Sequence, residues 1–140
     1  MMSTTLSLNW TGGKQGSGQI EGKDFSAAIS IPESLGGAGT GSNPKELYVA
    51  STAACFLATL SAISEGKKLP VEALNVQTEA EETKDSFTIT HHATLTLKAE
   101  ATEEDQAKAK EIVAAADKMC AVGNMARKAG VEISVTTQVN

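Results

Sequence analysis

Two stretches of the N-terminal third alternate between apolar and polar residues. Their apolar members are Leu6, Leu8 and Trp10 in the first stretch, and Phe25, Ala27, Ile29 and Ile31 in the second. A period of two is typical of half-buried β-strands. Four glycines within residues 11–18 predict a turn after the first strand. The pattern therefore indicates a small antiparallel meander, followed by a flexible glycine-rich connection over residues 32–41.

A long helix is predicted from Pro44 to about Glu65. Asn43 suits the position before the first helical turn, proline suits the first turn itself, and Glu46 completes a capping pattern. Gly66 provides the stop. Residues 47–63 read LYVASTAACFLATLSAI and are apolar around nearly the whole circumference. Such a helix must be buried on all sides. We therefore expect a second subunit to supply part of the cover, and expect no membrane span.

The C-terminal half alternates strands with a second helix. Val76, Thr78 and Ala80 predict one strand, and residues 87–97 predict a longer one with threonines on one face. Thr102, followed by three acidic residues, predicts the start of a helix that ends near Met119. A short turn and a strand over residues 131–139 complete the chain. The order β-β-β-α-β-β-α-β predicts an α+β fold.

Size and charge limit the functional classes. The 140 residues suit a single domain over 1–140, without a separate cofactor-binding fold. The net charge of -5 and the single arginine, Arg127, argue against nucleic acid as a partner. The N-terminus lacks the pattern of a secretory signal, so a cytoplasmic location is expected.

The two cysteines are the main candidates for chemistry. Cys55 lies in the charge-free helix and Cys120 at the end of the second helix, which suggests a peroxidatic and a resolving thiol. The plain alternative is an inert core cysteine. A zinc site with His91 and His92 is disfavoured, because adjacent strand residues point to opposite faces. His91 is expected to point inward and His92 outward.

The chain resembles the OsmC/Ohr family of thiol peroxidases, a resemblance that runs nearly end to end. It rests on TGG at 11–13, LGGAG at 35–39, SNPKELYVASTAACF at 42–56 and AAADKMCAVGNMARKAGVEISV at 114–135. The resemblance implies an intertwined homodimer, with long central helices, sheets wrapped outside and active sites at the subunit interface. It implies no cofactor.

The resemblance also implies a reaction. Cys55 attacks a hydroperoxide and becomes a sulfenic acid, which Cys120 captures as a disulfide. A dithiol reductant, often lipoyl-based, then restores both thiols.

Three positions depart from the family pattern. The family activates its first cysteine with an arginine from the N-terminal turn, and Lys14 or Gln15 stands there in this chain. The glutamate that holds that arginine is replaced by Lys45, with Glu46 one residue later. The family's cysteine-proline is Cys120-Ala121. Lys14 and Glu46 are the predicted replacements for the ion pair, and a lysine cannot reproduce the bidentate arginine fork.

Three functional classes follow. The first is a thiol-dependent reductase of organic hydroperoxides that serves oxidative-stress defence. The second is a non-catalytic protein that binds a fatty or aromatic ligand on the same scaffold. The third is a redox sensor that uses the Cys55–Cys120 disulfide. Two cysteines favour the first and third classes, whereas the altered ion pair favours the second.

Overall fold

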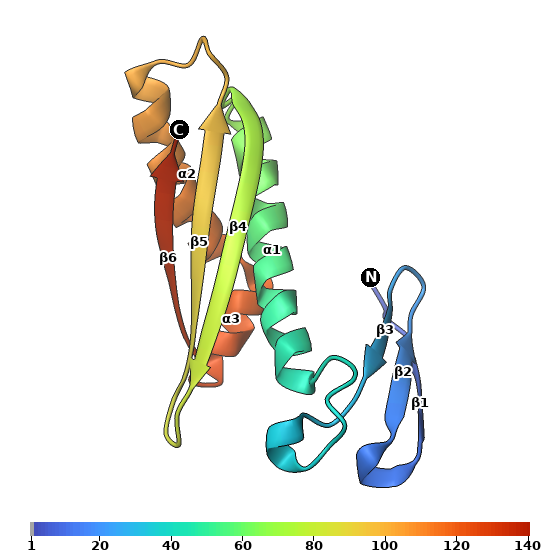
Figure 1. Cartoon of the computed structure of the whole chain (residues 1–140). Helices are drawn as coiled ribbons and strands as arrows, with labels where there is room; N and C mark the ends of the chain where they lie inside the picture. The colour runs from blue at the N-terminus through green and yellow to red at the C-terminus, as the bar shows by residue number, and fades with distance from the viewer. Residues whose placement is uncertain (1) are drawn as a thin grey trace. The chain divides into compact units, whose positions relative to one another are not determined.

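The computed structural model describes residues 2–140, and these divide into two compact units, one up to Tyr48 and one over Val49–Asn140. One domain over residues 1–140 stays a prediction beside this division. The first unit contains an antiparallel sheet in the order β1-β2-β3, shown in blue in Figure 1. Its strands are β1 (Ser7–Thr11), β2 (Ser17–Glu21) and β3 (Ser26–Ile29). The predicted N-terminal meander is therefore confirmed.

Helix α1 spans Pro44–Gly66, which agrees with both predicted ends. The side-chain oxygen of Asn43 accepts a hydrogen bond from the backbone N–H of Glu46 at 3.0 Å. This bond satisfies one of the donors that every helix start leaves without an intrahelical acceptor. The cap predicted from Asn43 is therefore confirmed, whereas the described contact of the Glu46 carboxylate is with the Ser42 hydroxyl.

The second unit contains a three-stranded sheet in the order β4-β5-β6. Strand β4 (Val71–Glu82) pairs antiparallel with β5 (Phe87–Leu97), and β5 pairs parallel with β6 (Glu132–Val139). A parallel pair needs a long crossover, and α2 (Glu103–Met119) with α3 (Ala121–Lys128) provides it. The short turn predicted after Met119 is wrong, because residues 121–128 form α3. The α+β fold class is confirmed.

The core of the second unit lies between β5 and the helices. Strand β5 alternates buried and half-buried residues, and its buried face packs with α1 and α2. Figure 1 shows these two helices beside the sheet. The main contributors to this core are Phe56, Leu60, Ala93, Leu95, Leu97, Ala109, Ile112, Val113 and Ala116.

The two histidines lie on opposite faces of β5, as the alternation predicts. His91 is 2% exposed and stacks on Phe56, the neighbour of Cys55, with ring centroids 5.0 Å apart. Burial lowers the pKa of His91, and its Nδ1 pairs with the Thr78 hydroxyl at 2.8 Å. His92 instead contacts Glu79 and Thr136 on the outer face. Neither ring is placed to share a metal ion with the other.

Only one face of α1 is buried within this chain. Its buried residues, Thr52, Phe56, Leu60 and Ser64, recur every four residues, as do the exposed alanines at 50, 54, 58 and 62. By length and composition alone, α1 is apolar enough to cross a membrane. The core helix of a soluble protein passes the same test, and Phe56 and Leu60 of α1 belong to the hydrophobic core of the second unit.

Candidate active site

The structure brings Cys55 and Cys120 together in the second unit. Cys55 is half-buried on α1, and Cys120 is 3% exposed at the junction of α2 and α3. Both thiols are free. Cys55 packs against the hydrophobic cluster that includes Cys120, and each thiol changes the pKa of the other. The two cysteines that the sequence singled out therefore form one site. The backbone places the more accessible sulfur on the long helix.

Cys120 is held by the helix that follows it. Its Sγ accepts the backbone N–H of Gly123 at 3.4 Å, so the thiol serves as the N-cap of α3. The S–H can point to the Thr52 carbonyl, 3.9 Å away, or toward Cys55. Burial raises the pKa of Cys120, and the neighbouring Cys55 raises it further. Cys120 therefore stays a thiol that can donate its proton to Cys55.

The pKa of Cys55 shifts in the opposite direction. Burial raises the pKa of its thiol, but hydrogen bonds outweigh burial and lower the pKa overall. In order of effect they come from the backbone of Val122, the thiol of Cys120, the hydroxyl of Thr59 and the backbone of Ala121. The Thr59 hydroxyl has one proton, which it also offers to the Cys55 carbonyl at 2.8 Å. The backbone donors of α3 and the Cys120 thiol therefore matter most.

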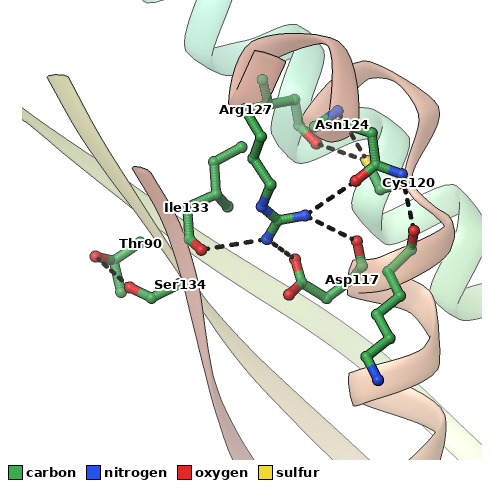
Figure 2. Close-up of polar contacts among 10 residues, drawn as sticks. Thr90, Asp117, Cys120, Asn124, Arg127, Ile133 and Ser134 are labelled. Atoms are coloured by element: carbon green, nitrogen blue, oxygen red, sulfur yellow. Dashed lines mark hydrogen bonds and ion pairs between the residues drawn. The ribbon is translucent and has the colours of Figure 1, made fainter. Parts of the chain in front are cut away.

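Arg127 fixes the position of α3. Its guanidinium reaches Asp117 Oδ1 at 2.7 Å and donates to the backbone carbonyls of Asp117 and Ile133, each at 3.2 Å (Figure 2). It also donates to the side chain of Asn124 at 3.1 Å. One side chain thus ties α2, α3 and β6 together. In the sequence, Arg127 stands out only as the single arginine. Its separation of ten residues from Asp117 does not indicate that the two form an ion pair.

Lys14 and Glu46 lie in the first unit. Lys14 belongs to the short turn between β1 and β2. Its side chain passes so close to Gly36 that a side-chain Cβ at residue 36 would lie only 2.9 Å from Lys14 Nζ. Gly36 adopts a φ of 86°, which favours glycine, and its carbonyl accepts a hydrogen bond from the Gln15 side chain. The turn is thereby tied to the glycine-rich loop.

The carboxylate of Glu46, in the first turn of α1, accepts a hydrogen bond from the hydroxyl of Ser42. This contact uses the carboxylate locally, next to the Asn43 cap. The predicted roles of Lys14 and Glu46 toward Cys55 stay predictions, because their described contacts are confined to the first unit.

The first unit also contains a cavity of about 350 Å³. Its walls are almost wholly apolar, and Ser30 is the one hydroxyl residue among them. The lining residues are Leu8, Trp10, Ile20, Ile29, Ser30, Ile31, Pro32, Leu35, Pro44 and Leu47. The cavity can accept an apolar group without demanding polar partners from it.

Fold and site together define a two-cysteine thiol protein of α+β architecture. A family model described as OsmC-like protein matches residues 37–136. The chain therefore belongs to the OsmC-like protein family, which confirms the resemblance read from its motifs.

Three relatives show how this chain is placed within the family. The uncharacterized protein YmaD of Bacillus subtilis (strain 168) is 32% identical over 139 residues, 96% of this chain and 92% of that protein. An organic hydroperoxide resistance protein of Xanthomonas axonopodis pv. citri is 42% identical over 60 residues, 42% of each chain. An organic hydroperoxide resistance protein OsmC from Legionella pneumophila has a crystal structure that matches with a TM-score of 0.68. That match has 24% identity and covers 97% of this chain and 96% of that one, so it bears on the fold alone.

Proposed function

We propose that this protein reduces organic hydroperoxides through Cys55 and Cys120. The observation that supports this most directly is a pair of contacting thiols whose pKa values move apart, down for Cys55 and up for Cys120. The thiolate is the nucleophilic form of cysteine, so the site favours Cys55 as attacker and Cys120 as the later proton donor. The names of relatives in the family support hydroperoxide as the substrate.

The proposed reaction has three steps. The Cys55 thiolate attacks the terminal peroxide oxygen, the O–O bond breaks, and the alkoxide takes a proton and leaves as an alcohol. Cys120 then attacks the oxidised sulfur of Cys55. The S–O bond breaks, water leaves with the Cys120 proton, and a disulfide forms. An external dithiol supplies two electrons and two protons, and thereby returns both thiols.

Oxidation of the reduced protein in a stopped-flow instrument tests this function, with cumene hydroperoxide and hydrogen peroxide as oxidants. We expect one equivalent of cumene hydroperoxide to remove both thiols and form one internal disulfide, faster than hydrogen peroxide does. Because only the thiolate attacks, the rate should rise with pH and reach half its maximum below the pKa of an ordinary cysteine, about 8.5. A protein that forms no internal disulfide with either peroxide does not have this function.

Lys14 is proposed to supply positive charge to Cys55, with Glu46 as its partner. The support is its place in the motif and the tie between its turn and the glycine-rich loop. Lys14→Met should slow oxidation of Cys55, whereas Lys14→Arg should preserve or increase the rate, because arginine adds a bidentate fork. The effect should weaken at high salt. Unchanged kinetics in Lys14→Met would remove Lys14 from the site.

A second copy of this chain is the proposed cover for α1. The exposed alanines at 50, 54, 58 and 62 leave one side of an apolar helix open, and small residues allow two helices to approach closely. The resulting assembly is a homodimer. Sedimentation that shows a stable monomer at micromolar concentration would contradict it.

The proposed location and reductant follow from the chemistry of the thiols. A reducing compartment such as the cytoplasm keeps both cysteines reduced between turnovers. A lipoyl-type dithiol is the proposed electron donor, and a turnover assay that compares it with a monothiol tests this choice.

Binding of an apolar ligand is the second candidate function. The apolar cavity of the first unit supports it, and its wall includes Trp10, the only tryptophan in the sequence. A fatty or aromatic ligand in this cavity should therefore change the tryptophan fluorescence. Saturable binding without any loss of thiols upon peroxide addition would favour this function over the peroxidase.

A further inference from the structure

The backbone N–H groups in the first turn of α3 lie close to the two cysteines. A helix start leaves its first N–H groups without an intrahelical acceptor. The N–H of Asn124 closes the first helical bond to the Cys120 carbonyl at 2.9 Å, and that of Gly123 binds Cys120 Sγ at 3.4 Å. The backbone of the two remaining residues, Ala121 and Val122, is near enough to the Cys55 thiol to lower its pKa through hydrogen bonding.

A second contact fixes the same geometry. Cys120 Sγ lies 3.9 Å from the carbonyl of Thr52, three residues before Cys55 on α1. Figure 2 shows Cys120 at the start of α3, with the pale green ribbon of α1 behind it. The start of α3 is therefore packed against the turn of α1 that carries Cys55. Arg127 holds it there through Asp117 and Ile133.

The helix that carries Cys55 cannot provide this stabilisation. Cys55 is the twelfth of 23 residues in α1, far from the positive end of its helix dipole. It lies instead in the turn of α1 that packs against the start of α3, the positive end of that shorter helix. Helix starts of this kind stabilise anions and activate cysteines in proteins.

We propose that the first turn of α3 is the thiolate-binding element of the site, and that the backbone amides of Ala121 and Val122 stabilise ionised Cys55. This inference deepens the proposed peroxidase function, on which its catalytic meaning rests. Backbone N–H groups thereby take part in stabilising the Cys55 thiolate, a role that the sequence motif predicts for the side-chain cation of Lys14. Ala121 matters because it carries an N–H at a position where a proline would have none.

Ala121→Pro is the variant that tests the proposal. Proline is well tolerated at the first position of a helix. The preceding residue must be extended, and Cys120 already has φ −68° and ψ 107°. The substitution therefore removes one N–H with little other change. Ala121→Ser is the matched control, because it alters the side chain and keeps the N–H.

The first readout is the rate at which Cys55 is alkylated by iodoacetamide across a range of pH. Ala121→Pro should move the midpoint of this profile to higher pH and slow the reaction at neutral pH by about three- to tenfold, the effect of one charge-assisted hydrogen bond at a half-buried sulfur. The plateau at high pH should stay the same, because ionised Cys55 remains accessible. Ala121→Ser should match the wild type. A folded Ala121→Pro protein with an unchanged midpoint overturns the proposal.

A second measurement uses the wild-type protein and does not depend on any substitution in α3. The amide proton resonances of Ala121 and Val122 should shift as Cys55 titrates, and these shifts should vanish in Cys55→Ser. If neither resonance responds to the ionisation of Cys55, the proposal fails.

Neither readout requires a peroxide. A site that shows the expected alkylation profile but does not react with hydroperoxides therefore retains this inference and loses the proposed function. A site that reduces hydroperoxides without any dependence on the Ala121 N–H does the reverse.

Discussion

Cys120→Ser is expected to stop after a single oxidation. One equivalent of organic hydroperoxide should convert Cys55 to a sulfenic acid that accumulates, and steady turnover with a dithiol reductant should fall by roughly a hundredfold or more. The reason is that the only other thiol lies against Cys55, buried and held as a proton donor. Serine keeps a hydroxyl donor near Cys55 but cannot form a disulfide. Dimedone labelling followed by mass spectrometry identifies the oxidised residue.

Cys55→Ser is the matched control for this experiment. Cys120 is buried and its pKa is raised, so it should react slowly with the same peroxide. If dimedone labels Cys120 in the Cys55→Ser protein but does not label Cys55 in the Cys120→Ser protein, the two assignments are reversed. If label is absent from both cysteines, the peroxidase mechanism is excluded.

Arg127→Met is expected to lower the free energy of unfolding by about 2 kcal/mol and to slow oxidation of Cys55 as well. The Arg127 side chain is only 31% exposed and that of its partner Asp117 only 21%, so the pair is partly shielded from water. Methionine keeps an unbranched apolar stem but loses every hydrogen bond to α2, α3 and β6. The start of α3 should then lose its fixed position against α1. Denaturant unfolding and iodoacetamide alkylation measure the two effects.

Arg127→Lys and Asp117→Asn separate charge from geometry. Lysine keeps the charge without the planar fork, so it should recover only part of the stability. A double-mutant cycle between Arg127→Met and Asp117→Asn should show coupling, because the two side chains contact directly. Additive effects in this cycle would mean that the backbone bonds of Arg127, and not the ion pair, carry its role.

The elements predicted correctly have strong local patterns at their ends or along one face. Asn43 and Pro44 mark the start of α1, and Thr102 forms the capping box at the start of α2. Strand β5 was clear because threonines alternate with apolar residues along it on both sides of His91 and His92. Such patterns are local, so they can be read before any tertiary contact is known.

Helix α3 was missed because its stability is not local. It has only eight residues and contains Gly123, so its intrinsic preference for a helix is weak. What stabilises it is the Cys120 cap and the contacts of Arg127 with α2 and β6. These partners lie on different elements, and no sequence spacing reveals them.

The same limit applies to the site. The two cysteines were identified from their surroundings and from the family motif, and the structure places them together. Backbone N–H groups are present at almost every residue, so the sequence gives no sign of which ones face Cys55. The role proposed for the amides of Ala121 and Val122 is inferred from the packing of α3 against α1, which no local pattern in the sequence indicates.

The hydrogen bonds proposed from α3 to ionised Cys55 also bear on the reduction potential of the cysteine pair. They stabilise the dithiol state, in which Cys55 is an anion, whereas a disulfide sulfur has no charge and is a poor acceptor. Stabilising the reduced state raises the potential, which makes the disulfide a stronger oxidant. An external dithiol can then reduce it more completely, so the turn that prepares Cys55 for attack also favours its return to the starting state.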